Sequence, residues 1–128
     1  MSDINDDLRL LLNEKQALMI ADEIYTFLQT ARSYYENDNL TVEGLNAFYN
    51  ERGSDPFSEL HNSRFSGSNV NELLESLRTK LRAIRCFDAN QICEYWHRTP
   101  EYMNQITDEA YEEYKRLKLK VSQHVANL

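Results

Sequence analysis

The chain has 128 residues, of which 41% are hydrophobic, and its 14 basic and 21 acidic residues give a formal net charge of −7. This length suits one domain whose core can form without disulfides. No apolar run approaches the roughly 18 residues of a membrane span, and the acidic first residues do not resemble a secretory signal. We therefore expect a protein of the cytoplasm, where its two cysteines stay reduced.

The negative charge is concentrated in the first half of the chain. Residues 1–66 contain 5 basic and 12 acidic residues, whereas residues 67–128 contain 9 of each. Such a distribution disfavours nonspecific contact with nucleic-acid phosphates and favours basic partners. The competing interpretation is that the charge serves only solubility.

The first half predicts a long helix followed by a short one. Over residues 6–36 the apolar residues recur at helical spacing. The expected core-facing stripe consists of Leu8, Leu12, Ile20, Ile24, Phe27, Leu28, Ala31, Tyr34 and Tyr35. Residues 37–39 favour a turn, Thr41 is the expected cap of a helix over 42–52, and Gly53 ends that helix.

The middle segment, near residues 53–69, predicts an irregular connection. It contains two of the three glycines. Asp55 can cap a helix, and Pro56 after it fits the first helical position. We expect a short helix over residues 56–62, in which Phe57 holds the segment against the bundle.

The second half predicts three more helices. The first has the clearest period in the chain, carried by Val70, Leu73, Leu74, Leu77, Leu81 and Ile84. Asp88 is the expected cap of the next, and Thr99-Pro100 opens the last, which runs to about residue 126 with a candidate break at Thr107-Asp108. A Glu112–Arg116 pair is expected within it. Together the patterns predict one all-α domain over residues 1–128, an irregular bundle of five or six helices.

The residues that bear reactive groups do not form a recognisable catalytic pattern. The candidate metal ligands Cys86, Cys93 and His97 lie close in sequence, but their spacing matches no common zinc motif. A di-iron site would need a second Glu-x-x-His pair, and no glycine-rich phosphate loop is present. We expect a non-enzymatic protein without a cofactor, whose cysteines pack as small apolar residues.

One row of arginines offers an alternative function. Arg78, Arg82 and Arg85 repeat at i, i+4 and i+7 and line one helix face. Such a row binds phosphates or carboxylates, but a nucleic-acid-binding domain is usually basic overall. The row could equally pair with the acidic first helix of the same molecule.

The sequence therefore favours a binding protein, an acidic inhibitor or adaptor of the immunity, antitoxin or phage counter-defence type. It would cover a basic surface of a nuclease or of a nucleic-acid-binding protein. The predicted partner contacts are Asp22, Glu23, Tyr25, Glu36 and Asp38, with Tyr95 as an aromatic anchor. The alternatives are a nucleic-acid-binding regulator that uses the arginine row, and a metal-binding helical enzyme. Self-association is left open.

Overall fold

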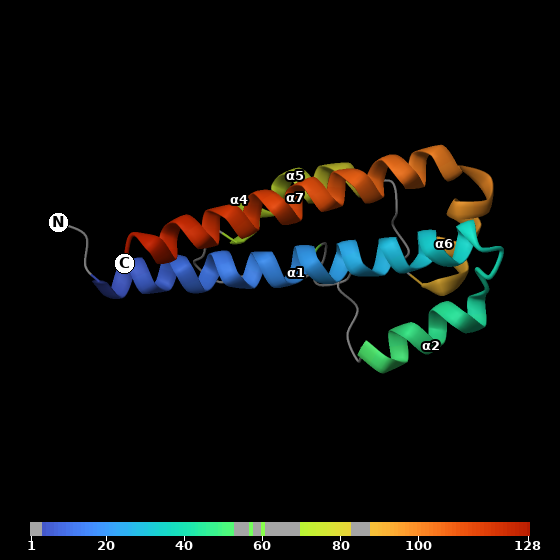
Figure 1. The fold of residues 1–128 in the computed structure, drawn as a ribbon, viewed down its shortest axis with the longest axis horizontal. Coiled ribbons are helices and arrows are strands. Elements are labelled where there is room, and N and C mark those ends of the chain that lie inside the picture. The colour runs from blue at the N-terminus through green and yellow to red at the C-terminus, as the bar shows by residue number, and fades with distance from the viewer. Residues whose placement is uncertain (1–3, 53–56, 58–59, 61–69, 83–87) are drawn as a thin grey trace.

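Two long antiparallel helices, α1 (Ile4–Glu36) and α7 (Pro100–Ala126), run side by side through the molecule (Figure 1). The computed structural model describes residues 4–52, 57, 60, 70–82 and 88–128. Within these residues it contains six helices and no strand, which confirms the predicted all-α fold. At 1.5 Å per residue, α1 is about 50 Å long and α7 about 40 Å long.

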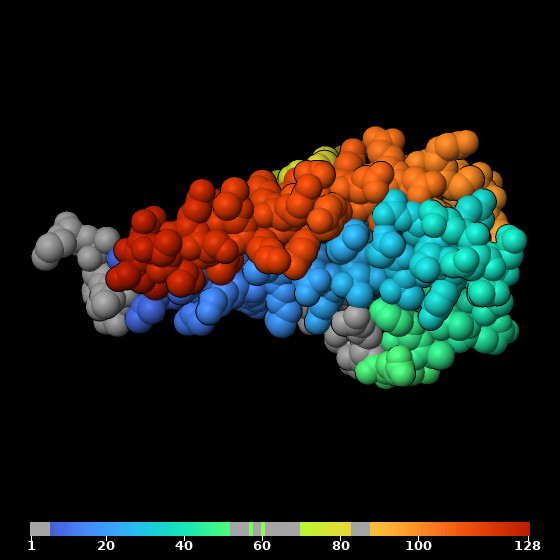
Figure 2. Space-filling model, viewed as in Figure 1, coloured from blue at the N-terminus to red at the C-terminus, as the bar shows by residue number. Residues whose placement is uncertain are grey.

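Four shorter helices pack along this pair. At the end where α1 finishes, α2 (Val42–Arg52) contacts α6 (Ala89–Arg98), and α6 also contacts α1 and α7. Further along, α4 (Val70–Leu73) contacts α1, and α5 (Glu75–Lys80) contacts α7. Figure 2 shows the face on which α1 and α7 lie alongside each other, with α2 at one end. None of the described helices is long and apolar enough to cross a membrane.

The core is aromatic near the end of α1. The ring of Phe27 lies 4.3 Å from that of Tyr49 and 5.5 Å, edge-on, from that of Phe57, measured between centroids. Phe57 and Leu60 are helical and fully buried, so the predicted packing of Phe57 against the bundle is confirmed. The remainder of the irregular connection predicted near 53–69 lies outside the described residues.

The prediction for α1 was wrong at two leucines. Leu8 and Leu12 are 44% and 65% exposed, whereas Leu11 and Ala17 are buried. The buried positions run in steps of three and four through Glu14, which is only 6% exposed. Because a glutamate occupies this core-facing position, the buried face of the helix is interrupted in the apolar pattern. The exposed leucines on the outer face then look like the continuation of the core-facing stripe. Tyr34 and Tyr35, also assigned to the stripe, are half-buried at its edge.

The helix expected over residues 70–84 is divided. Leu74, at φ −98° and ψ 0°, separates α4 from α5, and α5 ends at Lys80. The predicted leucine stripe nevertheless holds, because the residues flanking the break remain inward: Val70, Leu73, Leu74, Leu77 and Leu81 are buried. Ile84 lies outside the described residues.

Two predicted helix caps are confirmed. The backbone N–H of Gly44 donates to Thr41 Oγ1 at 3.0 Å, and that of Gln91 donates to Asp88 Oδ1 at 2.8 Å. Each such cap contributes about 1 kcal/mol. The candidate break at Thr107 is absent, since α7 is continuous and the buried hydroxyl of Thr107 donates to the Met103 carbonyl at 2.7 Å.

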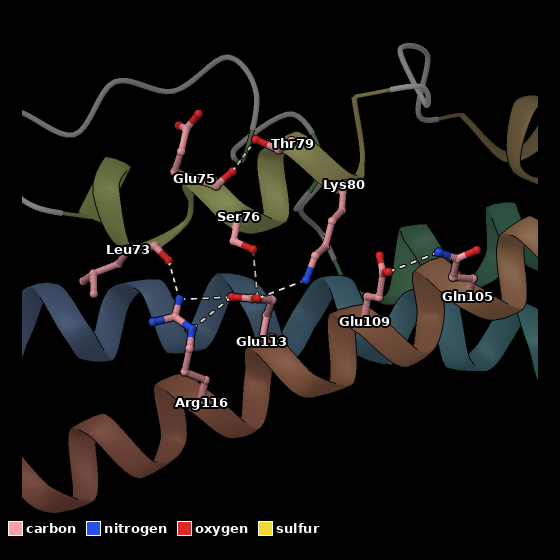
Figure 3. A network of polar contacts seen from close by, with 9 residues as sticks. All are labelled: Leu73, Glu75, Ser76, Thr79, Lys80, Gln105, Glu109, Glu113 and Arg116. Carbon is pink, nitrogen blue, oxygen red and sulfur yellow. Dashed lines mark hydrogen bonds and ion pairs between the residues drawn. The ribbon is translucent and has the colours of Figure 1, made fainter.

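The buried carboxylate of Glu113 joins α5 to α7 through a network of polar contacts (Figure 3). Its carboxylate accepts hydrogen bonds from Ser76 Oγ at 3.0 Å, Lys80 Nζ at 3.2 Å and Arg116 Nε at 3.1 Å, and Arg116 also donates to the Leu73 carbonyl at 2.8 Å. Burial alone would raise the pKa of Glu113, but these hydrogen bonds outweigh it and hold the pKa below its usual range.

The predicted Glu112–Arg116 pair was therefore wrong. Arg116 pairs with Glu113 at 3.0 Å, while Glu112, exposed on the outer face of α7, pairs with Lys115 at 3.1 Å. Glu113 pairs with the arginine because its carboxylate points toward α5, and the same arginine donates to the Leu73 carbonyl at the end of α4.

Candidate functional site

Two of the predicted partner contacts, Glu36 and Asp38, lie in one concave site at the end of α1. The site has a volume of about 470 Å³ and is lined by Tyr35, Glu36, Asp38, Leu40 and His97. We call it the acidic pocket. It combines two carboxylates with an aromatic ring, an imidazole and an aliphatic side chain, drawn from the end of α1, the turn after it and α6.

Glu36 is the last residue of α1, and the turn that follows positions Asp38. The N–H of Asn39 donates to the Tyr34 carbonyl at 2.7 Å, and that of Asp38 donates to the Tyr35 carbonyl at 3.1 Å. These two bonds form a Schellman motif, whose key residue adopts the left-handed conformation usually taken by glycine. Here that residue is Asp38, with φ +57°. An aspartate thus occupies a position where its side chain costs conformational energy and its charge projects from the helix end.

The wall of the pocket is held by aromatic packing. The ring of Tyr35 lies 5.4 Å from that of the fully buried Trp96 and 5.6 Å, edge-on, from that of His97, measured between centroids. His97 Nδ1 lies 2.7 Å from the Cys93 carbonyl oxygen. Since a carbonyl only accepts, Nδ1 carries the proton and Nε2 is left for another contact.

The electrostatic character of this end is negative. Glu36 and Asp38 are exposed, and within the part of the chain that the structure describes neither has an ion-pair partner. Glu43, in the first turn of α2, adds to the field. Burial raises the pKa of the Cys93 thiol, and the negative charge of Glu43 raises it further. A cation entering the pocket would therefore be stabilised by the carboxylates of Glu36 and Asp38.

The other acidic contacts predicted on α1 lie elsewhere. Asp22 is exposed and accepts a hydrogen bond from Thr26 at 3.3 Å, and Glu23 is half-buried. Asp22 and Glu36 are 14 residues apart, about 21 Å along the helix axis. One side chain of a partner cannot contact both groups, so only a broad interface would use them together.

Tyr25 belongs to a tyrosine cluster between α1 and α7. Its ring centroid lies 4.9 Å from that of Tyr111 and 6.2 Å from that of Tyr114. The ammonium groups of Lys115 and Lys118 lie over the Tyr111 and Tyr114 rings, at 4.6 and 5.8 Å. The Tyr25 ring thus packs between the two long helices, and only part of it remains for a partner. The position of Tyr25 in α1 did not predict this packing.

Tyr95, the predicted anchor, lines a separate groove. This groove has a volume of about 290 Å³ and is bordered by Gln91, Glu94, Tyr95, Arg98 and Thr99. Because Tyr95 and His97 are two residues apart on a helix, their side chains project toward different sides of α6. Trp96 is fully buried and its neighbour Tyr95 is half-buried.

The arginine row is only partly accessible. Arg78 is half-buried, and its Nε donates to the Leu60 carbonyl at 2.5 Å. Arg82 is exposed, and Arg85 lies outside the described residues. In the described part of the row, Arg78 and Arg82 therefore differ in their exposure and do not form a uniform basic surface.

The predicted metal ligands also fall partly outside the description. Cys93 is a buried free thiol, and Cys86 is not among the described residues. No group of three or more His, Cys, Asp or Glu side chains in the described part of the chain is arranged to hold a metal ion.

Comparisons with known proteins identify no relative. No protein-family model matches the chain, and searches of curated proteins and of solved structures found no significant match.

Proposed function

We propose that this protein is a non-catalytic inhibitor or adaptor that binds a basic surface of another protein and inserts one of its arginine or lysine side chains into the acidic pocket. The observation that carries the proposal is the pair of exposed carboxylates, Glu36 and Asp38, beside an aromatic and aliphatic wall. The charge of the first half of the chain supports the same polarity.

The chemistry of the pocket suits a guanidinium group best. A guanidinium donates several N–H groups in one plane and pairs with carboxylates through two hydrogen bonds. Its alkyl stem packs on apolar side chains, here Leu40, while its face stacks on an aromatic ring such as Tyr35. A lysine would satisfy the charge but would make fewer directed hydrogen bonds.

The proposed partner is a nuclease or a nucleic-acid-binding protein of the cytoplasm. Such proteins concentrate Arg and Lys on the surface that contacts phosphates, and an acidic protein placed there excludes the nucleic acid. Electrostatic attraction would accelerate the encounter, while a few buried side chains would supply most of the affinity.

A capture experiment with paired variants tests the proposal. The wild-type chain and the double variant Glu36→Gln/Asp38→Asn are used to capture proteins from extracts of the native host, followed by mass spectrometry and by measurement of Kd with the purified partner. The matched control, Glu72→Gln/Glu75→Gln, removes the same charge from exposed positions on α4 and α5.

We expect a basic partner whose Kd rises at least roughly tenfold with the pocket variant and remains unchanged with the control. Added nucleic acid should compete with the chain for this partner. Equal binding by both double variants would contradict the role of the pocket. Direct binding of DNA or RNA that is lost in Arg82→Glu would instead support the nucleic-acid-binding alternative.

A further inference from the structure

His97 is the only described residue lining the acidic pocket whose side chain can carry a positive charge. It shares the pocket with Tyr35, Glu36, Asp38 and Leu40. Histidine is the side chain that ordinarily changes its charge between about pH 5 and pH 8. The pocket therefore combines two carboxylates, which attract a cation, with a ring that can itself become a cation.

Two contacts hold the His97 ring in one orientation. Its Nδ1 lies 2.7 Å from the carbonyl oxygen of Cys93, one turn earlier on α6, and the ring meets that of Tyr35 edge-on. Because the Nδ1 edge is turned toward the backbone of α6, the opposite edge, which carries Nε2, is turned away from it. His97 is exposed, so this edge can contact a ligand. A group that is already positioned loses little conformational entropy on binding.

In its neutral form the ring offers a hydrogen-bond acceptor. Nδ1 carries the proton that it donates to the Cys93 carbonyl, so the lone pair of Nε2 is left for a donor. A guanidinium has five N–H groups in one plane, more than a single carboxylate can accept. Glu36, Asp38 and the Nε2 of His97 together supply acceptors for several of them. Neutral His97 thus assists the binding of an arginine.

In its protonated form the ring opposes the same ligand. Both ring nitrogens are then donors, and Nε2–H can bond to a carboxylate of the pocket. Glu36 and Asp38 are exposed, and in the described part of the chain neither is held in an ion pair. The imidazolium therefore neutralises part of the charge of the pocket and repels an incoming guanidinium. The chain itself then supplies the cation that the pocket attracts.

The charged groups on the elements packed against α6 are consistent with this effect. Glu43, in the first turn of α2, raises the pKa of the thiol one turn before His97. Glu101, in the first turn of α7, follows His97 by four residues. On α6 itself, the basic neighbour Arg98 pairs with Glu94 at 2.7 Å. Together with the two carboxylates of the pocket, these groups favour a cation, so it is the charge gained by the ring that opposes a second one.

We infer that His97 makes the acidic pocket sensitive to pH: with a neutral ring the pocket binds an arginine side chain of the partner, and on mild acidification the protonated ring replaces that arginine at Glu36 and Asp38. The inference rests on the proposed function, because it assigns a regulator to the same pocket. The partner is held near neutral pH and released when the surroundings become acidic.

Two substitutions fix the two states of the ring. His97→Gln retains a hydrogen-bond acceptor that stays uncharged, and His97→Arg supplies a permanent positive charge. Because His97 is exposed, both replacements should preserve the fold, which circular dichroism verifies. The probe is N-acetyl-arginine amide. NMR titration of the full chain gives its Kd at about pH 8 and at about pH 5.5, at constant ionic strength.

For the wild type we expect the Kd of the probe to rise at least roughly fivefold from the higher to the lower pH. His97→Gln should bind with nearly the same Kd at both, and His97→Arg weakly at both. Any titration of the carboxylates affects the wild type and His97→Gln alike, so the difference between these two proteins isolates the histidine. At the higher pH, the nitrogen NMR signals of the ring should show Nδ1 protonated and Nε2 without a proton.

A wild type whose binding does not change with pH, or changes no more than that of His97→Gln, would overturn the inference, as would a proton on Nε2 at the higher pH. These results leave the proposed function standing, since the probe still binds. A probe that binds the wild type at neither pH, or that binds Glu36→Gln/Asp38→Asn as tightly, would contradict the proposed function and the inference with it.

Discussion

His124 Nδ1 and Glu14 Oε2 lie 2.9 Å apart, although 110 residues separate them in the chain. This contact connects the start of the first long helix with the end of the last. It also explains how a glutamate is accommodated in a position that otherwise belongs to the core.

We predict that His124→Ala lowers the free energy of unfolding by about 1–3 kcal/mol, because the buried carboxylate of Glu14 loses its hydrogen-bond partner. Urea denaturation at pH 7 measures the loss, and Gln123→Ala, at the exposed neighbouring position, is the control. In a double-mutant cycle, Glu14→Leu should remove most of the effect of His124→Ala. Additive effects would show that the contact contributes nothing.

Acid should weaken the junction between α5 and α7. Because the folded-state pKa of Glu113 lies below the ordinary value of 4.5, the unfolded chain binds more protons at acidic pH. The stability from Glu113 is therefore fully present above that value and is lost as the pH falls through the folded-state pKa. We expect the difference in unfolding free energy between the wild type and Glu113→Gln to be largest at neutral pH and to shrink below it. A constant difference across this window would contradict the assignment.

The substitution Asp38→Gly should separate binding from stability. Glycine adopts the left-handed conformation of this position without a steric penalty, so we expect a gain of up to about 1 kcal/mol in unfolding free energy. The same change removes one carboxylate from the acidic pocket and should weaken partner binding. Asp38→Val, whose branched side chain disfavours positive φ, should instead lower Tm. Thermal unfolding followed by circular dichroism gives both results.

The thiol of Cys93 should react slowly while the protein is folded. Burial and the charge of Glu43 raise its pKa, so little of the reactive thiolate is present at pH 8, and the buried sulfur is poorly accessible. In a Cys86→Ser background, alkylation by iodoacetamide should be at least roughly tenfold slower than in denaturant. Equally fast alkylation in both states would mean that Cys93 is accessible in the folded protein.

Much of the fold was predictable because local patterns and tertiary packing agree. The leucine stripe from Val70 to Leu81 is buried, and Thr41 and Asp88 cap the helices that they were expected to begin. These features depend on spacing and on side-chain chemistry close in sequence. The helix α1 was misread at Leu8 and Leu12 because the partner that makes Glu14 acceptable in the core, His124, lies at the other end of the chain.

The candidate site was only partly predictable. Glu36 and Asp38 were selected for their charge, and the acidic pocket contains both. Two further residues of the pocket, Tyr35 and His97, lie on α1 and α6. The sequence pattern within each helix does not show that these two helices meet. Charge also led to the grouping of Asp22 with them, and Tyr95 was added as an aromatic anchor, although helix geometry separates the three places.

By itself, the sequence determined the helical class, most helix starts and the sign of the charge, because each follows from periodicity, capping chemistry or composition within a short stretch. Tertiary structure alone decided which carboxylates share a pocket, which glutamate is buried beside a histidine, and which leucines remain outside. Those outcomes depend on where distant helices end relative to one another, and this is set by the packing of the whole chain.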